Sequence, residues 1–124
     1  MRPSPEFPPV VVSSVTIVIP EPDDRPQVVC YATVHLNDAV RVCGCKLIRC
    51  ADGRVRFFGP HRRDREGKSY CVVHALDGSV RRLLEVAVLD AYRAYLVERE
   101  ANESLGRVAR YEMARKEAPR AFTA

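Results

Sequence analysis

The chain has 124 residues, 47% of them hydrophobic and 29% charged, with a formal net charge of +4. This composition is typical of one folded domain with an apolar core, and it excludes a disordered chain. The apolar runs before Pro20 are interrupted by Ser13 and Ser14, so they are far shorter than the roughly 20 residues of a membrane helix. We therefore expect no membrane-spanning segment, and the lack of an apolar leader predicts a cytoplasmic protein.

The first segment, residues 1–9, contains four prolines and is predicted to be a flexible tail. The folded domain is expected over residues 10–97. A helical extension is expected over residues 98–124.

Four strands are predicted in the first half of the domain, because β-branched and other apolar residues alternate with polar ones there. They cover residues 11–19, 28–36, 40–50 and 55–58, and turn residues separate them: prolines at 20–26, Asn37-Asp38, and Asp52-Gly53. The alternation changes phase near Gly44, which predicts a β-bulge in the third strand. The pattern is typical of an antiparallel meander.

A fifth strand is predicted over residues 69–74, after a loop over residues 61–68. A helix should then begin near Val80, with Asp77 or Ser79 as N-cap, and run to about Glu100. A weaker apolar stripe continues towards Pro119, so the chain ends in one long helix or in two helices hinged near residues 102–106. The fold class is therefore α+β, with a five-stranded antiparallel sheet followed by a C-terminal helix or helix pair.

The positive charge is concentrated in the middle of the chain. Residues 41–82 carry 11 basic and 4 acidic side chains, whereas residues 83–124 carry 7 of each. The loop contributes His61, Arg62, Arg63, Arg65 and Lys68 in a stretch whose long side chains can reach phosphate oxygens. The alternative is a solvated loop in which Asp64 and Glu66 pair with the arginines.

Further basic residues lie beside this loop in the expected fold. Arg41, Arg49, Arg54 and Arg56 are on neighbouring strands, and strand alternation can extend the positive charge across a sheet face. Arg81 and Arg82 begin the helix, where a cation opposes the helix dipole and so does not help the helix itself. We take Arg54, Arg56, Arg81 and Arg82 as members of the same candidate surface.

Other chemistries have weaker support. Five cysteines are an odd number and favour reduced thiols. Cys43-Gly44-Cys45 lacks the paired spacing of a zinc site, so no metal or other cofactor is expected, and Cys30, Cys43, Cys45 and Cys71 are interpreted as small apolar strand residues. Cys50, between two arginines, is the candidate for oxidation. His74 lies three residues after Cys71, a spacing that turns strand side chains to opposite faces, so no catalytic residue is assigned.

The ordered series of these segments resembles the SpoVG family, the small sporulation and septation regulators of bacteria. The resemblance covers roughly residues 11–95. It rests on Ala32-Thr33-Val34-His35-Leu36 followed by Val40-Arg41-Val42, on Cys45-Lys46-Leu47-Ile48 and on residues 53–63, with Gly67, His74, Arg81, Leu84, Val88, Leu89 and Tyr92 at suitable spacing.

The resemblance implies an antiparallel sheet with a packed helix, a homodimer, and binding of DNA or RNA without an enzymatic step. It also implies that Arg62 and Arg63 contact nucleic acid. A second hypothesis, from another class, is a protein-interaction adaptor in which residues 98–120 recruit a partner helix.

Overall fold

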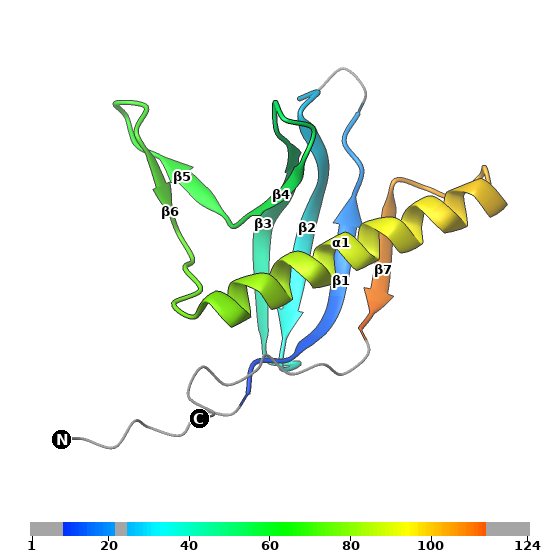
Figure 1. Cartoon of the computed structure of the whole chain (residues 1–124), viewed down its shortest axis with the longest axis horizontal. Coiled ribbons are helices and arrows are strands. Elements are labelled where there is room, and N and C mark those ends of the chain that lie inside the picture. Colours follow the sequence, from blue (N-terminus) through cyan, green and yellow to red (C-terminus); the bar gives the residue numbers. More distant parts are fainter. Residues whose placement is uncertain (1–8, 22–24, 114–124) are drawn as a thin grey trace.

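The computed structural model describes residues 9–21 and 25–113. One five-stranded antiparallel sheet has the order β4-β3-β2-β1-β7, so the expected α+β fold is confirmed (Figure 1). The elements in chain order are β1 (Val12–Val18), β2 (Val28–Leu36), β3 (Val40–Arg49), β4 (Val55–Phe58), β5 (His61–Arg63), β6 (Ser69–Cys71), α1 (Gly78–Ala101) and β7 (Val108–Glu112).

The fifth strand of the sheet is not the one that the sequence indicated. Residues 69–71 form β6, which pairs with β5 in a separate two-stranded ribbon, and the fifth place is taken by β7 beside β1. The expected helical extension over 98–124 is therefore wrong for residues 108–112. Their apolar pattern also fits a strand, because Ala109 and Tyr111 are half-buried while their neighbours are exposed. The predictions for residues 1–8 and 114–124 lie outside the described residues.

The bulge in β3 is confirmed. Ala32 pairs with Cys45 and Val34 with Val42, so β3 has one more residue than β2 between these pairs. Gly44 has φ +81°, a conformation that glycine adopts without steric cost. The bulge turns Val42 towards the core together with the buried Cys45 and Leu47, whereas Cys43 is exposed. Cys43 is thus not the buried apolar residue that the pattern suggested.

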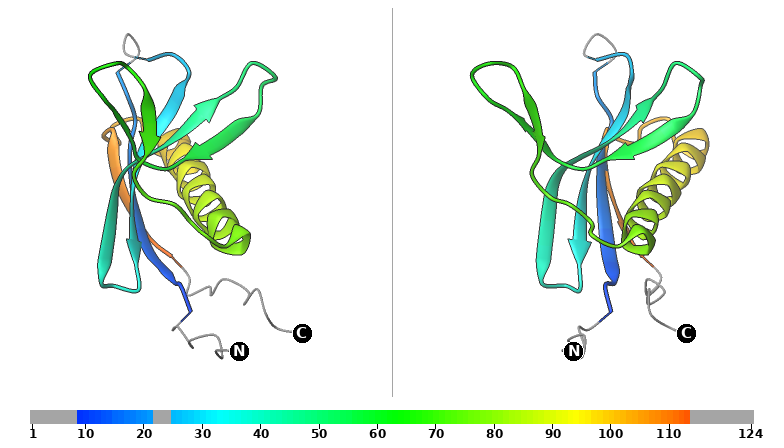
Figure 2. Two further views of the ribbon diagram at one scale, coloured as in Figure 1. Left: turned by 90° about the vertical axis from the view of Figure 1, so that its left-hand side faces the viewer. Right: turned by 60° about the vertical axis from the view of Figure 1, so that its left-hand side comes forward.

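The core lies between one face of the sheet and α1, which crosses it (Figure 2). Ile17, Val34 and Leu47 of the sheet and Val88 of the helix have no exposed surface. Asp77 is the N-cap of α1, and its side chain accepts a hydrogen bond from the backbone N–H of Ser79 at 2.8 Å. Within residues 25–113 the helical part of the chain is α1 alone, which ends at Ala101. Within the described residues, no helix combines the length and hydropathy needed to cross a lipid bilayer.

Candidate nucleic-acid interface

The basic segment 61–68 is not a loop but most of a β-hairpin. His61 pairs with Cys71, Arg62 with Tyr70 and Arg63 with Ser69. The base of the hairpin is closed by a 2.9 Å hydrogen bond from the N–H of Val72 to the carbonyl of Pro60. In the right-hand view of Figure 2 the hairpin reaches out on the side of the sheet away from α1.

Asp64 organises the tip of this hairpin. Its Oδ1 accepts hydrogen bonds from the backbone N–H groups of Glu66 and Lys68, both at 2.9 Å, and its Oδ2 accepts one from the Tyr70 hydroxyl at 3.1 Å. The bond from Lys68 is the main reason that the pKa of Asp64 lies below its ordinary value. This carboxylate is therefore engaged with the turn and not with the arginines.

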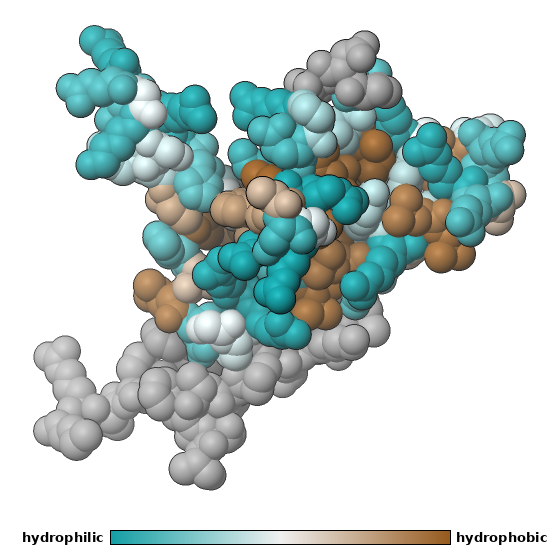
Figure 3. Space-filling model, turned by 45° about the horizontal axis from the view of Figure 1, so that its top comes forward, coloured by the Kyte–Doolittle hydropathy of each residue, from teal (hydrophilic) through white to brown (hydrophobic). Residues whose placement is uncertain are grey.

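The arginines of the hairpin have no acidic partner among the described residues. No carboxylate in residues 9–21 and 25–113 lies within 4.0 Å of the guanidinium groups of Arg62, Arg63 or Arg65. All three side chains are exposed, and Figure 3 shows the projecting hairpin as an almost wholly hydrophilic surface. The alternative of a locally neutralised loop does not describe this geometry.

A cleft lies between the hairpin and the open face of the sheet, the face that α1 does not cover. Because side chains alternate along a strand, His61 and Arg63 project from one side of the hairpin and Arg62 from the other. The cleft has a volume of about 420 Å³. It is lined by Arg25, Lys46, Ile48, Phe58, His61, Arg63 and Ser69. Its lining has basic and aromatic side chains and no carboxylate.

Charge is separated between the two layers of the protein. The strands carry Arg41, Lys46, Arg49, Arg56, Arg62, Arg63 and Arg110, and the only carboxylate in the described strands is Glu112. In contrast, α1 balances Arg81, Arg82, Arg93 and Arg99 with Glu85, Asp90, Glu98 and Glu100. The sheet and hairpin therefore present a positive surface, which attracts polyanions.

The remaining predicted residues fall in three places. The register pairs Arg56 with Ile48 on the open face. Arg54 lies in the turn before β4, with its Nε 4.0 Å from Asp52 Oδ2. Arg81 lines a second groove, described below, whereas Arg82 is exposed in the first turn of α1 and lines neither the basic cleft nor that groove.

Among the cleft residues that were not selected from the sequence are Arg25, Lys46 and Phe58. A signal existed for two of them. Lys46 alternates with the apolar Cys45 and Leu47, and Phe58 follows the apolar Phe57, so alternation favours the outer face for both. The short Asp52-Gly53 turn then places Lys46 opposite Phe58. For Arg25 the sequence offered no signal, because its position depends on the path of the turn after β1.

The second groove, about 390 Å³, lies between β2, β3, β4 and the start of α1, on the other side of the hairpin base. His61, Cys71 and His74 all contribute to its lining. The Cys71 thiol donates to the carbonyl of Val73 at 3.0 Å, and the His61 Nδ1 lies 2.7 Å from the carbonyl of Gly59. Among the described residues no hydrogen bond joins His74 to another titratable side chain.

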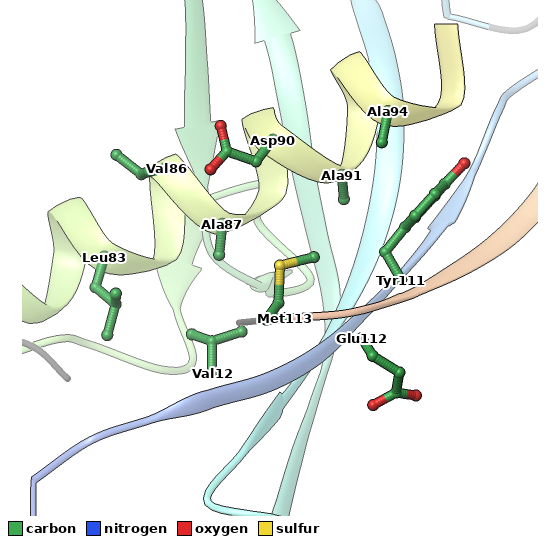
Figure 4. A pocket seen from close by; sticks show the side chains of 10 residues that line it. All are labelled: Val12, Leu83, Val86, Ala87, Asp90, Ala91, Ala94, Tyr111, Glu112 and Met113. Atoms are coloured by element: carbon green, nitrogen blue, oxygen red, sulfur yellow. The ribbon is translucent and has the colours of Figure 1, made fainter. Parts of the chain in front are cut away.

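A third groove, about 260 Å³, separates α1 from the end of β7 and is mostly apolar (Figure 4). Figure 4 shows Met113 and Tyr111 facing Ala87 and Ala91 of the helix across it. No residue of the candidate interface lines this groove.

All five cysteines are free thiols. Burial raises the pKa of Cys30 to about 12 and that of Cys45 to about 11, so both are held as neutral thiols in the core. Cys50 is half-buried. In the described residues no three His, Cys, Asp or Glu side chains are grouped closely enough to hold a metal ion.

Comparison with known protein families finds no family model that matches the chain, and a search of curated proteins finds no significant match. The resemblance to the SpoVG family stays a prediction from the residues quoted above.

Proposed function

We propose that this protein binds DNA or RNA through the β5–β6 hairpin and the neighbouring open face of the sheet, and that it regulates gene expression as SpoVG proteins do. In this proposal it acts in the cytoplasm, as a homodimer and without an enzymatic step, in a process such as sporulation or septation. The hairpin arginines and the cleft cations hold phosphate groups.

One observation carries the proposal: Arg62, Arg63 and Arg65 are exposed and unpaired in the described part of the chain, although two carboxylates lie within the same hairpin. Holding like charges together costs free energy unless an anion neutralises them. A nucleic-acid backbone supplies anions at regular spacing, and guanidinium groups match phosphate oxygens in pairs.

The proposal is tested with the double variant Arg62→Ala/Arg63→Ala, measured by fluorescence anisotropy against labelled DNA and RNA over a range of salt concentrations. We expect weaker binding to all sequences. The slope of log affinity against log salt should become flatter by about 1 for each phosphate group that the variant no longer neutralises.

The matched control is Arg93→Ala/Arg99→Ala, which removes the same charge from exposed positions of α1. If both double variants lose affinity equally, only net charge matters and the assignment to the hairpin is wrong. If wild-type protein binds neither DNA nor RNA at low salt, the proposed function itself is wrong.

The adaptor is kept as a second candidate, because Leu96 and Val97 near the end of α1 are 41% and 67% exposed. Exposed apolar residues at neighbouring helix positions are a common docking surface for a protein. Co-purification of a partner that is lost on Val97→Ser, together with no affinity for nucleic acid, would favour this alternative.

A further inference from the structure

The open face of the sheet carries a row of aromatic and basic side chains. Lys46 of β3 pairs with Tyr31 of β2 on one side and with Phe58 of β4 on the other. Directly paired residues in an antiparallel sheet point to the same face. Tyr31 and Phe58 are both half-buried, so each ring keeps exposed surface.

We propose that this row is a platform on which unpaired bases stack, and that the ligand is therefore single-stranded nucleic acid. The inference rests on the proposed function and names the class of nucleic acid. Tyr31 and Phe58 each stack on a base, and Lys46 between them holds the phosphate that connects the two nucleotides.

The geometry of the row suits this use. Tyr31 and Phe58 are two strands apart, which places their backbones about 10 Å from one another, twice the spacing of neighbouring strands. An extended single strand can lay successive bases across such a span. The bases of a duplex are already stacked and paired, so they cannot lie flat on protein rings.

The basic cleft adjoins one end of the row. Lys46 and Phe58 belong to both the row and the lining of the cleft, whose other basic residues are Arg25, His61 and Arg63. A strand that leaves Phe58 therefore passes directly between the sheet and the hairpin, where its phosphates meet Arg63. Alternating rings and cations along one path are the usual means of holding a single strand without regard to its sequence.

Charge argues against a second copy of this chain as the occupant of this face. Lys46, Arg41 and Arg56 all lie on it, and symmetric pairing of two such faces would bring like charges together. The carboxylate that the register places there, Glu112, is at the β7 edge, with its Oε1 3.1 Å from Arg110 Nε. The partner of this face is thus a polyanion.

The test compares a labelled oligothymidylate and a labelled oligouridylate with a duplex of equal length. We expect tighter binding of wild-type protein to the single strands. Phe58→Leu and Tyr31→Leu keep an apolar side chain but remove the ring, and each should weaken single-strand binding about tenfold, a larger loss than for the duplex. Tyr92→Leu, at a half-buried position on α1, is the control and should have no effect.

A second variant gives a readout other than a loss of affinity, which misfolding could also cause. The chain contains no tryptophan, so Phe58→Trp introduces a single indole into the row. Its fluorescence should be quenched when a single strand binds, and not when a duplex binds.

The outcomes separate the two proposals. If Phe58→Leu and Tyr31→Leu bind single strands as wild type does, or the duplex binds more tightly, the stacking platform is wrong, while weaker binding by Arg62→Ala/Arg63→Ala still supports the proposed function. If no nucleic acid binds, both are wrong.

Discussion

Gly44 in the bulge of β3 lies against Pro60, at the start of the projecting hairpin: a Cβ atom on Gly44 would be 3.3 Å from the Cβ of Pro60. This packing joins a local irregularity of the sheet to the element that carries the unpaired arginines. Two features therefore disfavour a side chain at this position: the proximity of Pro60 and the φ of +81° at Gly44.

Replacing Gly44 by Ala should destabilise the protein by more than the roughly 1–2 kcal/mol that a left-handed conformation costs a residue with a side chain. The excess arises because the new methyl group must displace Pro60. Gly53→Ala is the matched control, since Gly53 has φ +84° but no atom within 4 Å of the added Cβ. Urea unfolding of both variants checks this, and an equal loss of stability in the two would show that the proximity of Pro60 is unimportant.

The hairpin tip should become less ordered in acid, because the Asp64 carboxylate that accepts its hydrogen bonds is protonated there. The pKa of Asp64 is lowered on folding, chiefly by the N–H of Lys68. The contribution of Asp64 to the stability of the folded tip is therefore complete above the ordinary aspartate pKa of 3.8. The contribution is lost as the pH falls through the lower folded value. Amide resonances of Glu66 and Lys68, followed by NMR during acid titration, should shift in that range.

Asp64→Asn is the control for this titration, because its amide oxygen can still accept a hydrogen bond but the side chain does not ionise. The acid-dependent shift should disappear in this variant. Its persistence would assign the titration to another group.

The Tyr111 hydroxyl donates a hydrogen bond to Glu98 Oε2 at 3.0 Å and so joins β7 to α1. Tyr111→Phe should lower the free energy of unfolding by about 0.5–1.5 kcal/mol, the net value of one hydrogen bond. Burial, with help from Glu98, raises the pKa of Tyr111 from 10.0 to about 12.

Because the folded protein binds this proton more tightly than the unfolded chain does, wild-type stability should fall as the pH rises from 10.0 towards about 12. Denaturant unfolding of wild type and Tyr111→Phe across this interval measures the difference, which should shrink as the pH rises. A constant difference would contradict the raised pKa.

The cysteines should react with a thiol reagent in an order set by exposure. Cys43 is exposed and should react first in the native protein, whereas Cys30 and Cys45, buried and with raised pKa values, should react only on unfolding. Ellman's reagent follows both phases by absorbance. Cys43→Ser should remove the fastest phase, and its survival in that variant would point to Cys50 or Cys71.

Local patterns were sufficient to predict the elements whose residues determine them. The alternation in β2, the turns at Asn37 and Gly53 and the bulge at Gly44 each depend on residues close together in the chain. The same holds for the cap of α1, which the sequence narrowed to Asp77 or Ser79. Such patterns also identified the basic segment, because charge is counted along the sequence.

What the tertiary structure decided is which strands pair and which cations come together. Residues 69–71 and 108–112 both have short alternating patterns, so the sequence does not distinguish them. The free edge of β1 and the position of α1 determine that residues 108–112 join the sheet, whereas residues 69–71 pair with β5. The cleft likewise brings Arg25, Lys46 and Arg63 together from separate segments. The sequence alone identified the positive charge. The arrangement of that charge on one surface depends on contacts between residues far apart in the chain, and no local pattern encodes those contacts.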